Sequence, residues 1–162
     1  MASISASGID CAAPTRDWRR LTALLAAPLA WAALSGATST GTLEIGVDNL
    51  RNQRGIVRIC LTSNPAYFPR CMGDPAAKRI NVPVAQARDL RFDGMAQGIY
   101  AISAMHDENG NGRLDTFLGI PREGFGFSRN PRVTVGPPSF NQVRFQVGPG
   151  GNSQRIRFQY FV

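Results

Sequence analysis

The chain has 162 residues, a length that suits one domain with a further segment attached. It carries 18 basic and 11 acidic residues, a formal net charge of +7, which is compatible with binding to nucleic acid, anionic lipid or an acidic polysaccharide. The arginines are scattered along the predicted strands without an interleaved aromatic platform, which argues against nucleic acid and indicates ordinary solvated charge.

The first 37 residues are typical of a cleavable signal peptide. A basic flank that ends at Arg20 precedes an apolar run over 21–34, and small residues suited to signal peptidase follow at Ser35 and Ala37. The apolar run is shorter than the roughly 20 residues that a membrane-spanning helix needs. A buried core helix or a short membrane anchor is the alternative. The paired arginines of the flank also allow a twin-arginine signal, although their neighbours match that signal poorly.

Residues 38–162 are predicted to form a single domain with 15 basic and nine acidic residues. A domain of about 125 residues can bury roughly two thirds of its unfolded surface. Export to an oxidising compartment favours a disulfide between its two cysteines, Cys60 and Cys71. A catalytic or metal-binding role would need a CxxC pair or more than the one histidine present, so two unlinked thiols are the main alternative.

From residue 42 onward, apolar and polar residues alternate, as in strands with one buried face and one wet face. The segments that show this alternation are 42–47, 55–62, 79–84, 99–106, 142–147 and 155–162. Turn-forming sequences separate them, and we interpret 84–92 as a loop that leads into a short strand. The pattern predicts an all-β fold, specifically an antiparallel β-sandwich of about seven strands.

Residues 106–139 interrupt this alternation. The stretch is rich in glycine and proline and contains one short candidate strand, at 132–135. Its phenylalanines argue against disorder, so we expect an ordered loop that folds over one end of the sandwich. We expect these side chains in the core, with a contact patch for a partner or glycan as the alternative. The three are Phe117, Phe125 and Phe127.

The segment 107–115 places oxygen-bearing side chains at alternate positions, as a calcium-binding loop does. Glu123 can swing in from the following segment, and two or three carboxylates indicate a weak site, with a Kd of about 10⁻⁴ to 10⁻³ M. The alternative is a metal-free turn, because Asp and Asn bond their own backbone and Asn-Gly pairs favour tight turns. The candidate ligands are Asp107, Asn109, Asn111, Asp115 and the carbonyl of Arg113.

His106 is the single histidine of the chain. One imidazole without a companion Cys or His argues against zinc, so we interpret His106 as a hydrogen-bonded residue that fixes the loop where it leaves its strand. The sequence has no G-x-S-x-G motif, so an acyl-transfer enzyme is not supported. The alternative function is a hydrolase-type envelope enzyme that uses His106 with Asp107, Asp115 or Glu123 as acid and base.

The stretch "GIYAISAMHDENGNGRLDTFLGIPREGFGFSRN", followed by "GPPSF", resembles an uncharacterised bacterial family, domain of unknown function 2141. Its pattern reads HDxNxNGxLD, then GxPxEGxGFS, then GPPxF, and the resemblance covers residues 40–160. It implies a small exported β-sandwich of transthyretin-like or carboxypeptidase-regulatory-like shape with no established activity. The family usually has one more residue before "FLG", often Asn, and its absence makes calcium less expected here if that residue is a ligand. Cys60 and Cys71 lie outside the family pattern.

We therefore expect an exported, non-enzymatic binding or structural module of the cell envelope, either periplasmic or secreted. Its working end would be 106–139, with a weak Ca²⁺ site, and its partner a protein or polysaccharide of the envelope. We expect no transmembrane span once the signal is removed. A binder of lipid or polysaccharide is a third reading, which would need the arginines to cluster on one face.

Overall fold

The computed structural model describes residues 39–161, so the predicted signal peptide lies outside the described residues. Strands and turns make up almost all of this part, and none of its helices has the length and apolarity that crossing a membrane requires. The elements are β1 (Gly41–Asp48), β2 (Ile56–Thr62), η1 (Pro65–Tyr67), β3 (Lys78–Pro83), η2 (Val84–Gln86), β4 (Asp89–Met95), β5 (Gly98–Asp107), β6 (Thr116–Phe117), β7 (Ile120–Pro121), β8 (Gly124–Phe127), α1 (Phe140–Val143), β9 (Phe145–Val147) and β10 (Gly150–Arg157).

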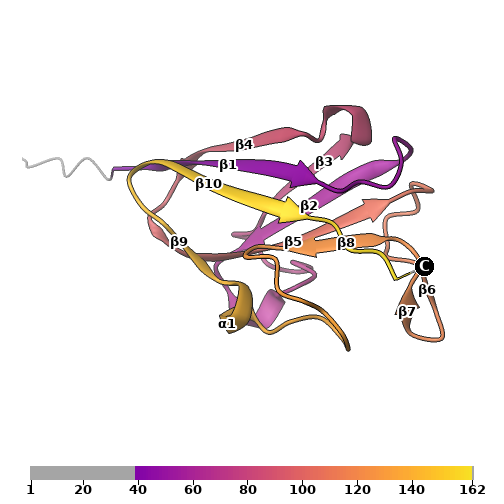
Figure 1. Ribbon diagram of the computed structural model, residues 1–162. Helices are drawn as coiled ribbons and strands as arrows, with labels where there is room; N and C mark the ends of the chain where they lie inside the picture. The colour runs from indigo at the N-terminus through magenta and orange to yellow at the C-terminus, as the bar shows by residue number, and fades with distance from the viewer. Residues whose placement is uncertain (1–38, 162) are drawn as a thin grey trace, which may run out of the picture. The chain divides into compact units, whose positions relative to one another are not determined.

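The strands form two main sheets and a separate hairpin (Figure 1). One sheet has the order β10-β1-β4 and the other the order β3-β2-β5-β8, with β9 paired to the first residues of β5. The hairpin consists of β6 and β7. The all-β prediction is confirmed. The sequence analysis did not predict that one pair, β1 with β10, is parallel over eight residues of each strand.

Alternate residues of both sheets enter one hydrophobic core, which confirms the period-two interpretation of β1 and β2. Each large apolar side chain that is fully buried stabilises the fold by roughly 1.5–3 kcal/mol relative to an exposed one. Because this core contains side chains from both sheets, their burial holds the two sheets together. Those from β1 and β2 are Leu43, Ile45, Val47, Val57, Ile59 and Leu61, and Leu90, Phe92, Ala104, Ile156 and Phe158 pack with them.

The region before β9 differs from the prediction. Residues 142–147 do not form one strand, because a capping box begins helix α1 after Ser139. The backbone N–H of Ser139 donates to the side chain of Gln142 at 2.7 Å, and this exchange satisfies N–H groups at the start of the helix. The candidate strand at 132–135 is absent as well, since Val133 donates its N–H to the side chain of Gln159 and Val135 is exposed.

The last strand begins and ends earlier than predicted. We expected 155–162, whereas β10 runs from Gly150 to Arg157 because it pairs with β1 along its whole length. Of its residues only Ile156 is buried, so its hydrophobic pattern is weak. The chain then continues beside β8, where Phe125 and Gln159 exchange two backbone hydrogen bonds of 3.1 and 2.8 Å. The C-terminal segment therefore joins the two sheets.

Cys60 on β2 and Cys71 form a disulfide, with their Cα atoms 6.1 Å apart, which confirms the predicted pairing. Asp74 provides a second attachment in the same loop. It accepts a hydrogen bond from the hydroxyl of Thr62 at 2.5 Å and another from the backbone N–H of Ala76 at 2.9 Å. The loop between β2 and β3 is thus held to β2 both covalently and by hydrogen bonds.

Candidate functional site

The predicted site residues come together where β5 ends. β5 delivers His106 and Asp107, and residues 107–115, here named the Asp107 loop, lead into the β6–β7 hairpin. β8 then returns beside β5, with Gly124 opposite His106. Asp107, the last residue of β5, and the side chains of Asn109, Asn111 and Asp115 after it all lie in this one loop.

Asp107 is fully buried and organises the loop. Its Oδ1 accepts the backbone N–H of Asn111 at 3.0 Å, and its Oδ2 accepts the N–H of Gly112 at 2.9 Å. Arg58 on β2 donates its Nε–H to the same Oδ2 at 2.7 Å. Gly112 has φ +83°, a backbone angle that glycine adopts without steric cost, and this turns its N–H toward the carboxylate.

The charge of Asp107 is balanced inside the protein. Burial raises the pKa of this carboxyl, but the hydrogen bond and charge of Arg58 and the N–H of Gly112 outweigh it. The net result is a pKa below the ordinary value for Asp. Asp107 is therefore an ionised carboxylate that folds the loop around itself and ties it to β2.

The two asparagines of the loop bond both to the backbone and to Asp115. Asn109 and Asn111 each accept the N–H of the residue two positions on, at 3.0 Å, which is the Asx turn expected of this residue type. Their amide groups donate to the two oxygens of Asp115, at 2.7 and 2.9 Å. These two hydrogen bonds, from Asn111 and Asn109, lower the pKa of Asp115.

Two glutamates, Glu123 and Glu108, accept hydrogen bonds that hold the Asp107 loop in place. Glu123 is buried and accepts backbone N–H groups from Glu108 at 2.9 Å and from Asp115 at 3.0 Å, so it bridges the two ends of the loop. Glu108 turns the other way and bonds Arg51 and Asn52, each at 2.7 Å. Burial raises the pKa of Glu108, but its hydrogen bonds with Asn52 and Arg51 lower the pKa by a larger amount. The pKa of Glu108 is therefore below the ordinary value for Glu.

His106 is enclosed, with no exposed surface. Its Nε2 lies 2.7 Å from the carbonyl oxygen of Arg54 and its Nδ1 lies 2.8 Å from the hydroxyl of Tyr160. A carbonyl only accepts, so Nε2 donates to Arg54, and Nδ1 makes its hydrogen bond with the hydroxyl of Tyr160. The Tyr160 oxygen in turn accepts the N–H of Arg51 at 3.2 Å. Both ring nitrogens are therefore used to fix the end of β5.

The phenylalanines of 106–139 separate into two groups. Phe125 and Phe127 on β8 are buried in a second apolar cluster, as we expected of core residues. Phe117 on β6 is 63% exposed, so the expectation of a core position is wrong for this residue. The difference arises because β8 pairs with β5, whereas β6 pairs with β7 alone.

The oxygen set of the Asp107 loop is of the type that calcium prefers, but much of it already accepts hydrogen bonds. Arg58 also places a positive charge against Asp107, which opposes a second cation at that carboxylate. Within residues 39–161, no group of three or more His, Cys, Asp or Glu side chains is arranged to hold a metal ion.

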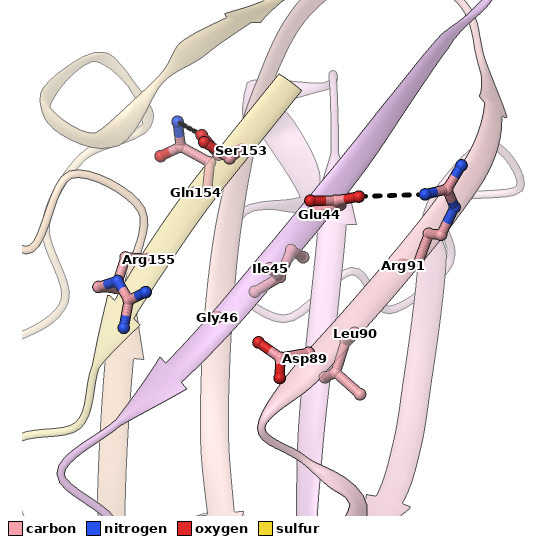
Figure 2. A pocket seen from close by; sticks show the side chains of 9 residues that line it. All are labelled: Glu44, Ile45, Gly46, Asp89, Leu90, Arg91, Ser153, Gln154 and Arg155. Atoms are coloured by element: carbon pink, nitrogen blue, oxygen red, sulfur yellow. Dashed lines mark hydrogen bonds and ion pairs between the residues drawn. The ribbon is translucent and has the colours of Figure 1, made fainter. Parts of the chain in front are cut away.

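A shallow depression of about 370 Å³ lies on the outer face of the three-stranded sheet, over β10, β1 and β4 (Figure 2). Gly46, which has no side chain, lies among its lining residues. Three of its charged lining residues form ion pairs: Glu44 binds Arg91 at 3.1 Å, and Arg155 binds Asp48 at 2.9 Å. None of the lining residues belongs to 106–139, so this depression is separate from the predicted site.

Sequence reasoning missed the partners that come from other strands. Arg58, Arg51 and Tyr160 each contact the site, yet they lie 49 to 57 positions away in the chain from the residues they bind. Arg58 stands on the alternating strand β2, where a charged residue normally signals a solvent-facing position. Only the register of β2 against β5 reveals its ion pair with Asp107.

These features define an all-β protein with one disulfide and a polar loop that is held by its own hydrogen bonds. Residues 45–156, more than half of the chain, match the family described as "Uncharacterized protein conserved in bacteria (DUF2141)", and the chain belongs to this family. The match includes the whole Asp107 loop and confirms the resemblance stated from the sequence. No curated protein and no solved structure matches the chain.

Proposed function

We propose that the protein is an exported, non-enzymatic binding or structural module of the bacterial cell envelope, located in the periplasm or outside the cell. The observation that carries this proposal is the use of the polar signature residues. His106, Asp107 and Glu123 are buried and bonded to backbone or to an arginine. Because these residues hold the loop in shape, they support the role of a scaffold. Such a scaffold would present a surface to an envelope protein or polysaccharide.

The hydrolase alternative receives no such support. A general acid or base must come within hydrogen-bonding reach of the substrate, directly or through one water. His106 has no exposed surface, and both of its nitrogens already have protein partners. We therefore assign His106 to the structure of the strand end.

The finer description of the fold belongs to this proposal. We infer a β-sandwich of transthyretin-like or carboxypeptidase-regulatory-like type. Its support is a large core cluster to which residues of both main sheets contribute.

Export is tested by expressing the full chain with a C-terminal tag in a Gram-negative bacterium and fractionating the cells. We expect the tagged protein in the periplasm or medium, with a mass that corresponds to cleavage near Ala37. A Leu24→Arg/Leu25→Arg variant, which interrupts the apolar run, should remain cytoplasmic and uncleaved. An intact wild-type chain in the cytoplasm would contradict the proposed location.

We also propose that the Asp107 loop binds Ca²⁺ weakly. Its support is the convergence of Asn109 and Asn111 on both oxygens of Asp115, which gathers three candidate ligand side chains. Because the charge of Arg58 lies beside Asp107, we propose a Kd at the weak end of the expected range, about 10⁻³ M.

A thermal melt in EDTA and in about 5 mM Ca²⁺ tests this site. For a Kd of about 10⁻³ M, calcium should add about 1 kcal/mol of stability and raise the Tm by a few degrees. Asp115→Asn should abolish the increase, whereas Asp93→Asn, on the exposed face of β4, should retain it. Identical melts with and without calcium would establish the metal-free turn instead.

A further inference from the structure

The β6–β7 hairpin carries a concentrated set of exposed apolar side chains. Seven large apolar residues in 39–161 are substantially exposed, and three of them lie within four positions here: Phe117 at 63%, Leu118 at 86% and Ile120 at 49%. Phe117 and Ile120 are directly paired across the hairpin, so their side chains lie on the same face. Figure 1 shows the hairpin outside the two main sheets. Its tip is therefore an exposed apolar surface.

The turn of this hairpin has a favoured glycine at its second position but a leucine at its first. Leu118 has φ +49° and Gly119 has φ +80°, the two positive angles of a two-residue hairpin turn in which Asn-Gly is preferred. A bulky residue in the left-handed region is strained, and here no burial of the side chain compensates. The fold does not need leucine at this place. Strain of this kind points to a role in function.

The charged groups around the hairpin are arranged with arginine outward. Arg122 donates its backbone N–H to the carbonyl of Asp115 at 2.8 Å, which places it at the base of the hairpin, and it is exposed. Arg113, just before the hairpin, has 81% of its side chain exposed, and its Nε lies 3.9 Å from Oδ1 of Asp115. Of the nearby carboxylates, Glu123 is buried, and Asp115, whose side chain is 35% exposed, has both oxygens held by asparagine amides. The outer surface here is apolar at the tip and basic at the base.

We propose that the β6–β7 hairpin binds an anionic lipid bilayer. Phe117, Leu118 and Ile120 enter the boundary between headgroups and acyl chains, while Arg113 and Arg122 contact lipid phosphates. An exposed apolar tip with arginines at its base fits this partner, because a bilayer needs no complementary pocket and attracts basic side chains. This inference rests on the proposed envelope location and adds a lipid surface to the partner classes proposed above.

The test uses the full chain with Trp18→Phe and Trp31→Phe, which removes both tryptophans. Leu118→Trp then places a single indole at the tip, where the exposed side chain leaves room for it. The matched control is Val135→Trp, at a residue that is 92% exposed outside the hairpin. Emission is recorded with phosphatidylcholine vesicles and with vesicles of equal phosphatidylcholine and phosphatidylglycerol, each with and without brominated acyl chains.

We expect the tip indole to shift to shorter wavelength and to be quenched by brominated lipid with the phosphatidylglycerol vesicles, while the control indole does neither. High salt should weaken the response, because screening reduces the attraction of exposed arginines to phosphate. A separate variant, Phe117→Ser/Leu118→Ser, should raise the Kd for these vesicles by about tenfold or more, since it removes most of the apolar surface of the tip.

A tip indole that stays in water would overturn the proposal, even if another part of the chain binds the vesicles. Equal responses from the tip and the control, or from neutral and anionic vesicles, would overturn it as well. The vesicle experiment does not depend on export. A cytoplasmic, uncleaved chain would therefore contradict the proposed location. It would leave the conclusion on lipid binding, which the vesicles test separately, unchanged.

Discussion

The ring of His106 lies between Phe158 and Tyr160, with centroid distances of 6.3 and 6.1 Å and nearly perpendicular planes. Its two hydrogen bonds connect three separate parts of the chain: β5, the loop before β2 and the C-terminal segment. The guanidinium of Arg51 lies over the Tyr160 ring, 4.8 Å from its centre. A buried imidazole in such a position is stabilising only while each nitrogen keeps its partner.

The hydroxyl of Tyr160 is the partner of Nδ1 of His106. Tyr160→Phe leaves Nδ1 of the buried His106 without its hydrogen-bond partner and should lower the free energy of unfolding by about 1–3 kcal/mol. Tyr100→Phe is the control, because it removes a hydroxyl whose bond to the carbonyl of Ala96 is exposed. Urea denaturation of the two variants measures both effects. Equal losses would show that the His106 bond has no special weight.

At the scale of one element, β8 depends on its glycines. A side chain at Gly124 would meet the ring and hydroxyl of Tyr160, and one at Gly126 would come within 2.6 Å of Ile156. The alternate residues, Phe125 and Phe127, point into the second apolar cluster. The sequence "GFGF" therefore provides one face that packs aromatic rings and another that allows the C-terminal segment to approach closely.

Gly124→Ala should destabilise the protein by about 1–3 kcal/mol, because the added methyl group forces Tyr160 away from His106. Gly151→Ala in β10 is the matched control: it has open space around it and an ordinary backbone angle, so its effect should be close to neutral. Thermal or urea unfolding of both variants tests this. A tolerated Gly124→Ala would mean that the ring of Tyr160 can move without cost.

At the scale of the whole molecule, stability depends on several carboxylates with lowered pKa values. The hydroxyl of Thr62 lowers the pKa of Asp74 against a smaller effect of burial, and asparagine amides lower that of Asp115. In Asp107 and Glu108 burial acts in the opposite direction, but their arginine and hydrogen-bond partners prevail. Asp74 lies in the loop between β2 and β3, and the other three carboxylates lie in the Asp107 loop. Protonation at low pH therefore destabilises the fold at two separate places.

Each of these carboxylates binds protons more readily in the unfolded chain than in the folded protein. Their stabilisation is therefore complete above the unfolded values of about 4 and is lost as the pH falls through the lower folded values. We expect the free energy of unfolding to decrease steeply below about pH 4. Asp107→Asn should be less stable than wild type at neutral pH, and the difference should shrink in acid. A constant difference across this range would contradict the role assigned to Asp107.

Local patterns in the sequence determined much of the fold. Alternation identified β1, β2, β3 and β5, because a strand with one buried face repeats its apolar residues every second position. The cysteine pairing followed from their number, and the spacing of Asp and Asn indicated a turn between strands. These signals need no knowledge of distant parts of the chain, and the sequence alone contains them.

Other features depended on contacts between distant residues, and only the tertiary structure decided them. β10 is a strand because of its parallel pairing with β1, although its own side chains alternate weakly. In β8, glycines hide the alternation that Phe125 and Phe127 would otherwise show. Phe117 has the same chemistry as these two and is exposed, because its strand pairs with nothing but the other half of its hairpin. Burial and register are set by which strands become neighbours, and that choice is made by the molecule as a whole.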